Sequence, residues 1–264
     1  MNPYDAFRAL HHRPGVPLVL PNAWDHASAA ALAEAGFEAI GTTSLGVASA
    51  AGKPDATGTT REETLHLGHR LARLPVPVTV DIEGGFGADP AGVAELAADL
   101  VRAGVAGVNI EDGRPDGTLA PLAFQRELIS AVKEAAPALF VNARTDTYWL
   151  PGQAGETARR LSAYQEAGAD GLFVPGLQDE SVIAALTAEY EAPLNILYAP
   201  GRLTVARLAE LGVARVSTGS LLFRAAVQHA VDVAGAVARS EVHVDAGGVV
   251  AYAVADGWAD VYRM

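Results

Sequence analysis

The sequence predicts a (β/α)8 barrel of the TIM type, and a recurring joint is the main reason. A glycine follows an alanine- or leucine-rich stretch and precedes a short apolar run four times, at Ala35-Gly36, Ala103-Gly104, Ala167-Gly168 and Leu211-Gly212. Glycine after the last helical turn suits a left-handed cap, and a buried parallel strand is expected to follow. Eight alternating units over about 220 residues favour a closed barrel, with an open doubly wound sheet as the alternative.

The eight units place the strands and the main helices. The expected strands are 17–20, 39–43, 78–82, 107–110, 139–143, 171–174, 194–197 and 215–218. Helical patterns separate them, for example at 26–35, 61–73, 90–103 and 121–136. We therefore expect one catalytic domain over residues 1–240. Residues 241–264 form a C-terminal tail, whose Tyr252, Trp258 and Tyr262 are expected to pack on the barrel or on a partner subunit.

Charge and composition exclude several classes of protein. The formal net charge is −12, and no dense basic patch offsets it, so binding to nucleic acid is not expected. The pair Arg159-Arg160 is expected on a solvated helix face, and His11-His12 on the surface. The sequence contains no cysteine, which excludes disulfides and thiolate chemistry. No apolar stretch of about 18 residues is free of charged or polar groups. We expect a cytoplasmic protein that does not span a membrane.

Three carboxylates form the strongest candidate site. Asp81 and Glu83 lie two residues apart at the end of one expected strand, where residues i and i+2 share a face. Glu111 ends the next strand. Barrel enzymes carry their chemistry at the carboxyl ends of the strands. Converging carboxylates in such a place suit a hard divalent cation with oxygen ligands.

Five motifs at the expected strand ends resemble the isocitrate lyase / phosphoenolpyruvate mutase superfamily over about residues 5–231. They are Pro21-Asn22-Ala23-Trp24-Asp25, Gly41-Thr42-Thr43-Ser44-Leu45-Gly46, Val80-Asp81-Ile82-Glu83-Gly84-Gly85-Phe86-Gly87, Asn109-Ile110-Glu111-Asp112 and Ala143-Arg144-Thr145-Asp146. The resemblance implies a Mg2+ ion, with Mn2+ as a substitute, held by Asp81 directly and by Glu83 and Glu111 mostly through water. It also implies a barrel whose last helix is exchanged within a homodimer or homotetramer.

The same resemblance implies a site for a small 2-oxo acid. Ser44 and the backbone around Leu45 and Gly46 match positions that grip the substrate carboxylate, and Arg144 matches the arginine that binds the same acid. Asp55 matches an aspartate on the mobile loop after the second strand. Asp81 and three more strand-end residues complete the predicted substrate-contacting set, namely Trp24, Thr43 and Asn195.

Departures from the superfamily limit the expected reaction. The usual Asp-x-Asp is Asp81-Ile82-Glu83, and a short loop at 113–118 stands where the carbon–carbon lyases carry a cysteine acid. Pro175 stands where the mutase has a histidine. The chain thus retains the residues for metal and carboxylate binding but not the recognisable reaction-specific ones.

We expect a Mg2+-dependent enzyme that cleaves a carbon–carbon bond of an oxaloacetate-like 2-oxo (di)carboxylic acid, or decarboxylates it, through a metal-bound enolate. Asp55, Arg144 and Glu111 are the expected catalytic residues, and His66 and Tyr198 are further candidates for acid or base. Two alternatives stay open. One is carbon–phosphorus chemistry on phosphonopyruvate, and the other is a 2-oxo acid binding protein without turnover.

Overall fold

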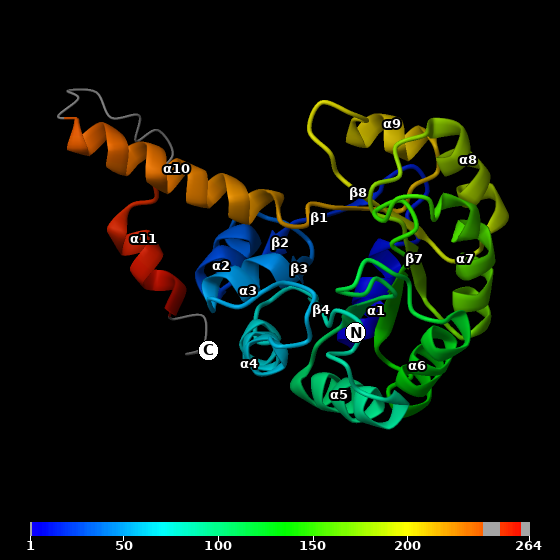
Figure 1. The fold of residues 1–264 in the computed structure, drawn as a ribbon. Coiled ribbons are helices and arrows are strands. Elements are labelled where there is room, and N and C mark those ends of the chain that lie inside the picture. The colour runs from blue at the N-terminus through cyan, green and yellow to red at the C-terminus, as the bar shows by residue number, and fades with distance from the viewer. Residues whose placement is uncertain (1, 240–248, 260–264) are drawn as a thin grey trace.

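The computed structural model describes residues 2–239 and 249–259, and its centre is a nearly closed barrel of parallel strands (Figure 1). The strands follow the order β1-β9-β8-β7-β6-β5-β4-β3-β2. Their bounds are β1 Leu18–Leu20, β2 Asn22–Ala23, β3 Ile40–Thr42, β4 Val78–Asp81, β5 Gly107–Glu111, β6 Phe140–Arg144, β7 Gly171–Phe173, β8 Leu194–Leu197 and β9 Arg215–Ser217. The predicted fold class is confirmed.

The first expected strand is split into β1 and β2 by Pro21. β1 pairs with β9, and β2 pairs with β3, so the two short pieces together occupy one position of the barrel. Proline has no N–H to donate to a strand ladder, although the Pro21 carbonyl still accepts from Gly41 N at 2.9 Å. Nine strand pieces therefore fill the eight expected positions.

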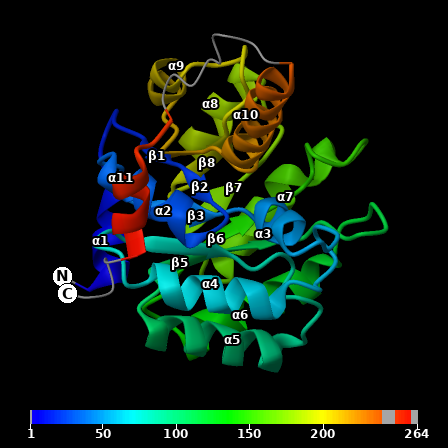
Figure 2. The same cartoon turned by 90° about the vertical axis from the view of Figure 1, so that its left-hand side faces the viewer.

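Helices surround the barrel (Figures 1 and 2). Their bounds are α1 Pro3–Leu10, α2 His26–Glu34, α3 Ser44–Ala50, α4 Arg61–Leu71, α5 Pro90–Ala103, α6 Leu122–Ala135, η1 Ala154–Glu156, α7 Thr157–Glu166, α8 Glu180–Glu189, α9 Val205–Glu210, α10 Leu221–Ala238 and α11 Tyr252–Gly257. α5 shows why the recurring joint works. Asp89 caps its first turn, Pro90 opens it, and Gly104 ends it at φ +94°. The helix α3, directly after β3, was not predicted.

Two apolar clusters hold the barrel. The larger lies between the strands and the surrounding helices. The smaller centres on Phe7 of α1, whose ring meets that of Phe140 edge-on at 5.3 Å. His11 stacks on Phe140 at 4.4 Å and is only 4% exposed, so its predicted surface position is wrong. The sequence pattern misleads because His11 follows α1 and turns toward this cluster.

The C-terminal helices leave the barrel wall and return (Figure 1). α10 extends away from the barrel, and Ala236 is the one buried residue of its 18. By length and composition alone, α10 is the one described helix that could cross a membrane, although Arg224 and Asp232 interrupt it. Trp258, next to α11, donates from Nε1 to Glu34 Oε2 of α2 at 2.8 Å.

The aromatic residues expected in the tail have different surroundings. Trp258 is partly buried against the main apolar cluster, and its carbonyl contacts His26 Nε2 at 2.8 Å. Tyr252 is 86% exposed. Tyr262 lies outside the described residues.

Candidate functional site

A cavity of about 340 Å3 opens at the carboxyl ends of the strands. Because every strand pairing is parallel, all these ends meet at one mouth of the barrel. Seven of the residues predicted for the site line the cavity: Thr43, Ser44, Leu45, Asp55, Asp81, Glu111 and Arg144. They come from five different segments of the chain, which the barrel brings together.

Trp24 and Gly46 lie outside this lining. The Trp24 ring faces Phe223 of α10, with ring centroids 5.4 Å apart. A side chain at Gly46 would approach the Trp24 Cβ to 2.7 Å and the Thr43 Cγ2 to 2.8 Å. These two residues therefore pack α3 and α10 against the barrel, and the structure does not bring them to the cavity.

Asn195 does not line the cavity either, although Ser217, to which it is hydrogen-bonded, does. It is 1% exposed, and its Nδ2 donates to Ser217 Oγ at 3.0 Å. The fully buried Arg215 donates from Nε to the same hydroxyl at 3.0 Å. Asn195 thus belongs to a polar layer inside the barrel. Of the two further acid or base candidates, neither His66 nor Tyr198 lines the cavity.

Arg144 lies between carboxylates from two strands. β5 and β6 pair Glu111 with Arg144 directly, and the Arg144 Nη1 lies 2.6 Å from Glu111 Oε2. Asp146 takes the guanidinium in a fork, with Nε–Oδ1 at 2.6 Å and Nη2–Oδ2 at 3.1 Å. Burial by itself lowers the pKa of Arg144, but Glu111, Asp146 and Asp81 around it raise that pKa above its ordinary value. The guanidinium is therefore charged and fixed in direction.

The carboxylates nevertheless outnumber this one cation. Burial raises the pKa of Asp81 to about 6, and Arg144 opposes the rise, while Asp55 and Glu83 add to it. Burial also raises the pKa of Glu111 well above its ordinary value, against Arg144 and together with Asp81 and Asp146. These five acids, with one guanidinium among them, repel each other, and such an environment favours a further cation.

Glu83 does not point where the strand pattern predicts. β4 ends at Asp81, and Glu83 has a left-handed φ of +51°, so the alternation of faces stops before it. Its Oε1 accepts from Thr60 Oγ1 at 2.6 Å, and its Oε2 accepts from Gly58 N at 2.8 Å. Glu83 therefore fastens the loop after α3 beside the cavity. The expectation that Asp81 and Glu83 meet at one point is wrong.

The oxygen donors still fit a Mg2+ ion. In residues 2–239 and 249–259, no group of three or more histidine or acidic side chains is placed to hold a metal. Asp81 lines the cavity, and its Oδ1 accepts from Glu83 N at 3.0 Å. Mg2+ retains several waters and commonly takes one or two protein carboxylates. One direct ligand at Asp81, with Glu111 contacting a bound water, would match that preference.

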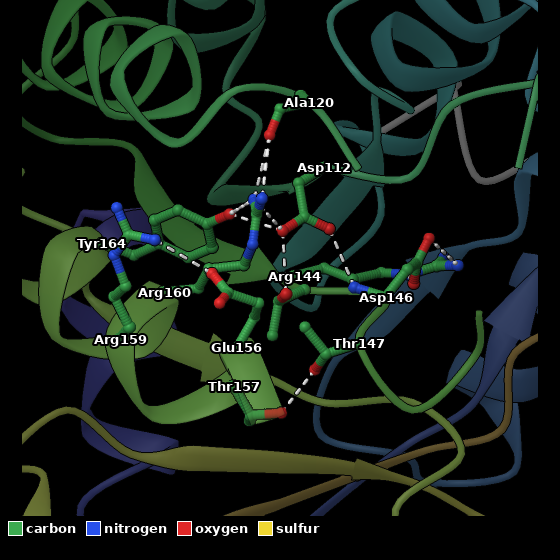
Figure 3. A network of polar contacts seen from close by, with 11 residues as sticks. Asp112, Ala120, Arg144, Asp146, Thr147, Glu156, Thr157, Arg159, Arg160 and Tyr164 are labelled. Atoms are coloured by element: carbon green, nitrogen blue, oxygen red, sulfur yellow. Dashed lines mark hydrogen bonds and ion pairs between the residues drawn. The ribbon is translucent and has the colours of Figure 1, made fainter. Parts of the chain in front are cut away.

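A buried network behind Arg144 was missed from the sequence (Figure 3). Asp112 is fully buried, and its carboxylate accepts from Tyr164 OH at 2.5 Å, Arg160 Nη1 at 3.0 Å, Thr145 Oγ1 at 2.8 Å and Asp146 N at 2.8 Å. Arg160 is 7% exposed, so its predicted position on a solvated face is wrong. The i, i+4 spacing of Arg160 and Tyr164 was the available signal.

The same network clamps the short loop that follows β5. Residues 112–120 form a hairpin, closed by Ala120 N donating to Asp112 O at 2.7 Å and by a bridge between Gly113 and Leu119. Arg160 donates from both terminal nitrogens to Ala120 O, at 3.1 and 3.0 Å. Arg160 and Asp112 thus hold both ends of the hairpin beside the cavity.

Comparisons with known proteins agree with this geometry. The family model described as phosphoenolpyruvate phosphomutase matches residues 7–247. An uncharacterized protein of Mycobacterium tuberculosis is 47% identical over 238 residues, covering 89% of this chain and 90% of that protein. Oxaloacetate decarboxylase of Pseudomonas aeruginosa is 33% identical, covering 79% and 76%. A solved structure from Burkholderia cenocepacia, described as a lyase/mutase, is 38% identical, with a TM-score of 0.87 and coverage of 97% and 95%.

Proposed function

This chain belongs to the phosphoenolpyruvate phosphomutase family, and from that premise we propose that it is a Mg2+-dependent enzyme acting on a small 2-oxo (di)carboxylic acid such as oxaloacetate. The reaction breaks a carbon–carbon bond at C3, either by lysis or by decarboxylation, and leaves an enolate. Arg144 carries the proposal, because its fixed guanidinium can bind the anionic acid, while the carboxylates beside it can bind the cation that the acid chelates.

The substrate carboxylate would lie between Arg144 and the start of α3. Ser44 and Leu45 line the cavity from the first turn of that helix, where backbone N–H groups have no acceptor within the helix. Thr43 lines the same wall. The forked contact with Asp146 fixes the direction of the Arg144 guanidinium, so the substrate meets a preorganised donor.

Asp81 would hold the metal, with Glu111 contacting its waters. Mg2+, or Mn2+ in its place, would supply a Lewis acid that stabilises negative charge developing on the substrate's keto oxygen. Glu83 supports this arrangement from the side, since its backbone N–H fixes one oxygen of Asp81.

Asp55 is the proposed proton-transfer residue. It lines the cavity from the loop after α3, and its charge contributes to the raised pKa of Asp81 and of Glu111, which marks it as a neighbour of both. With no cysteine in the sequence, the acid of the carbon–carbon lyases has no counterpart. Asp55 also favours the second candidate, carbon–phosphorus chemistry on phosphonopyruvate, which Pro175 in the cavity wall opposes.

We further propose a cytoplasmic homodimer or homotetramer in which α10 packs on a partner copy. Three valines of α10 are largely exposed: Val227 (48%), Val231 (61%) and Val237 (62%). A second chain would cover this apolar surface. The net charge of −12 supports the absence of nucleic acid among the partners.

An NMR turnover screen tests the activity. Oxaloacetate, phosphonopyruvate, methylisocitrate and dimethylmalate are each incubated with Mg2+, with and without the protein, because free Mg2+ alone decarboxylates oxaloacetate. Protein-dependent formation of pyruvate from oxaloacetate, lost in Arg144→Lys, is the expected result. Turnover of phosphonopyruvate alone would favour the second candidate. Binding without turnover of any of the four compounds would overturn the enzyme proposal.

A further inference from the structure

A second chamber of about 460 Å3 lies beside the cavity, and the hairpin 112–120 borders both. The two spaces share five lining residues: Ala56, Glu111, Gly113, Arg114 and Pro115. A side chain at Gly113 would approach Asp146 Oδ2 to 2.1 Å, so the hairpin packs closely against Asp146, which forms the ion pair with Arg144. The second chamber therefore shares Glu111 and the hairpin with the cavity that Arg144 lines.

Gln125 of α6 is the unexplained group in this chamber. It lines the space and is 1% exposed, and neither its Nε2 nor its Oε1 has a hydrogen-bond partner among the described residues. Buried polar groups are normally paired, and an unpaired amide lowers stability. The side chain offers one kind of donor and one kind of acceptor, which a hydroxyl or an amide can satisfy together.

The charges around the chamber do not suit an anionic tail. Four acids line it, and all of them already receive bonds from the protein: Glu83, Glu111, Asp112 and Asp116. The single cation of the lining is Arg114, exposed on the hairpin. Phe86, Ala88 and Phe124 supply apolar walls. Gln125 is the neutral side chain of the lining whose donor and acceptor both lack a partner among the described residues, so we take its chemistry as the guide to the tail.

We propose that the second chamber receives the tail of the substrate, and that the tail is uncharged and ends in a hydroxyl or an amide paired with Gln125. The inference rests on the proposed function, because Arg144 must hold the 2-oxo acid group. It narrows the substrate class to 2-oxo acids with a neutral hydrogen-bonding substituent beyond C3.

N-substituted oxamates test the tail without turnover, since their amide nitrogen replaces C3. Oxamate itself reports on the 2-oxo acid site. Four tails of equal length follow: N-propyl, N-(2-hydroxyethyl), N-carboxymethyl and N-(2-aminoethyl). Their dissociation constants are measured calorimetrically with Mg2+ for the parent protein, for Gln125→Leu, and for Gln153→Leu as a control outside both chambers.

The hydroxyethyl compound is expected to bind about five- to tenfold more tightly than the propyl compound, which corresponds to one hydrogen bond. Gln125→Leu is expected to remove this preference, to leave oxamate binding unchanged, and to unfold at the same or a higher temperature. Gln153→Leu should change none of the dissociation constants.

Two results separate the inference from the proposed function. The first result is that oxamate binds but the hydroxyethyl compound binds no more tightly than the propyl compound, or keeps its advantage in Gln125→Leu. In either case Gln125 does not bind a neutral tail in the chamber. Tightest binding of the carboxymethyl or aminoethyl compound would overturn the inference equally. If oxamate itself does not bind, the proposed function fails, and the inference fails with it.

Discussion

Asp112 holds Asp146 through the backbone, since its Oδ1 accepts the Asp146 N–H at 2.8 Å. Asp146 in turn takes the Arg144 guanidinium in a fork. A residue with no exposure to solvent therefore fixes the direction of the arginine at the cavity. The other Asp112 oxygen binds Arg160 and Tyr164, so α7 supports the same geometry (Figure 3).

Arg160→Met tests the strength of this support. The substitution removes the cation from a buried carboxylate, which typically costs about 3–5 kcal/mol. Urea unfolding is the measurement, and the neighbouring Arg159→Met is the control, because Arg159 is exposed with an ion pair to Glu156 at 3.2 Å. The control should cost less than about 1 kcal/mol. Equal losses in the two variants would contradict the network's role.

The fold could be predicted because its signals are local and repeated. A glycine cap followed by a buried strand recurs along the chain, and parallel pairing then brings the strand ends to one mouth. Asp81, Glu111 and Arg144 follow from that rule alone. The departures arise where the regular pattern stops, as at Glu83, whose positive φ redirects its side chain to Thr60 and Gly58.

Other parts of the site depend on contacts that periodicity does not encode. Arg160 and Arg159 are adjacent and alike in sequence, yet one is buried against Asp112 and the other is exposed. Only the packing of α7 against the hairpin 112–120 separates them. Gln125 is another such case, because nothing in an amphipathic helix distinguishes a buried amide that faces a chamber from a solvated one.

Asp81→Asn is expected to weaken Mg2+ binding by at least about tenfold, since the substitution removes the carboxylate that we propose as its direct ligand. Isothermal titration with MgCl2 in the presence of oxamate is the measurement. Asp116→Asn is the matched control, because Asp116 lies on the exposed hairpin and caps Thr118. The prediction is wrong if both variants retain the parent affinity for Mg2+.

Arg144→Lys is expected to weaken oxamate binding by about 10- to 100-fold, because one ammonium cannot replace a forked guanidinium. The charge balance with Glu111 and Asp146 is retained, so the fold should survive. Arg207→Lys provides the comparison, since Arg207 forms ion pairs with Glu180 and Glu210 away from the cavity. If Arg144→Lys binds oxamate as tightly as the parent protein, Arg144 does not contribute to the binding site.

His11 is expected to make the fold acid-sensitive. Burial lowers its pKa to about 3, with the charge of Arg215 acting in the same direction. Below about pH 6.5 the unfolded chain binds a proton that the folded chain does not. For this group, the free energy of unfolding therefore falls by up to ~1.4 kcal/mol for each unit by which the pH is lowered. The loss continues down to about pH 3.

His11→Phe isolates that contribution. The ring contact with Phe140 can persist, while the titrating group is gone. Urea unfolding between pH 4 and 7 should show a shallower decline for His11→Phe than for the parent. His12→Phe removes an exposed histidine and should follow the parent. Parallel slopes in all three proteins would contradict a neutral buried His11.

The exposed face of α10 predicts assembly. Light scattering should give a dimer or a tetramer, because an apolar helix left open to water is unfavourable and a second copy can cover it. Val231→Asp should shift the protein toward monomer, since it places a charge in that contact. Val16→Asp is the control, because Val16 has a similar exposure, 55% against 61%, at the opposite end of the chain. A parent protein that is monomeric at all concentrations, or equal dissociation in both variants, would show that α10 does not form the subunit contact.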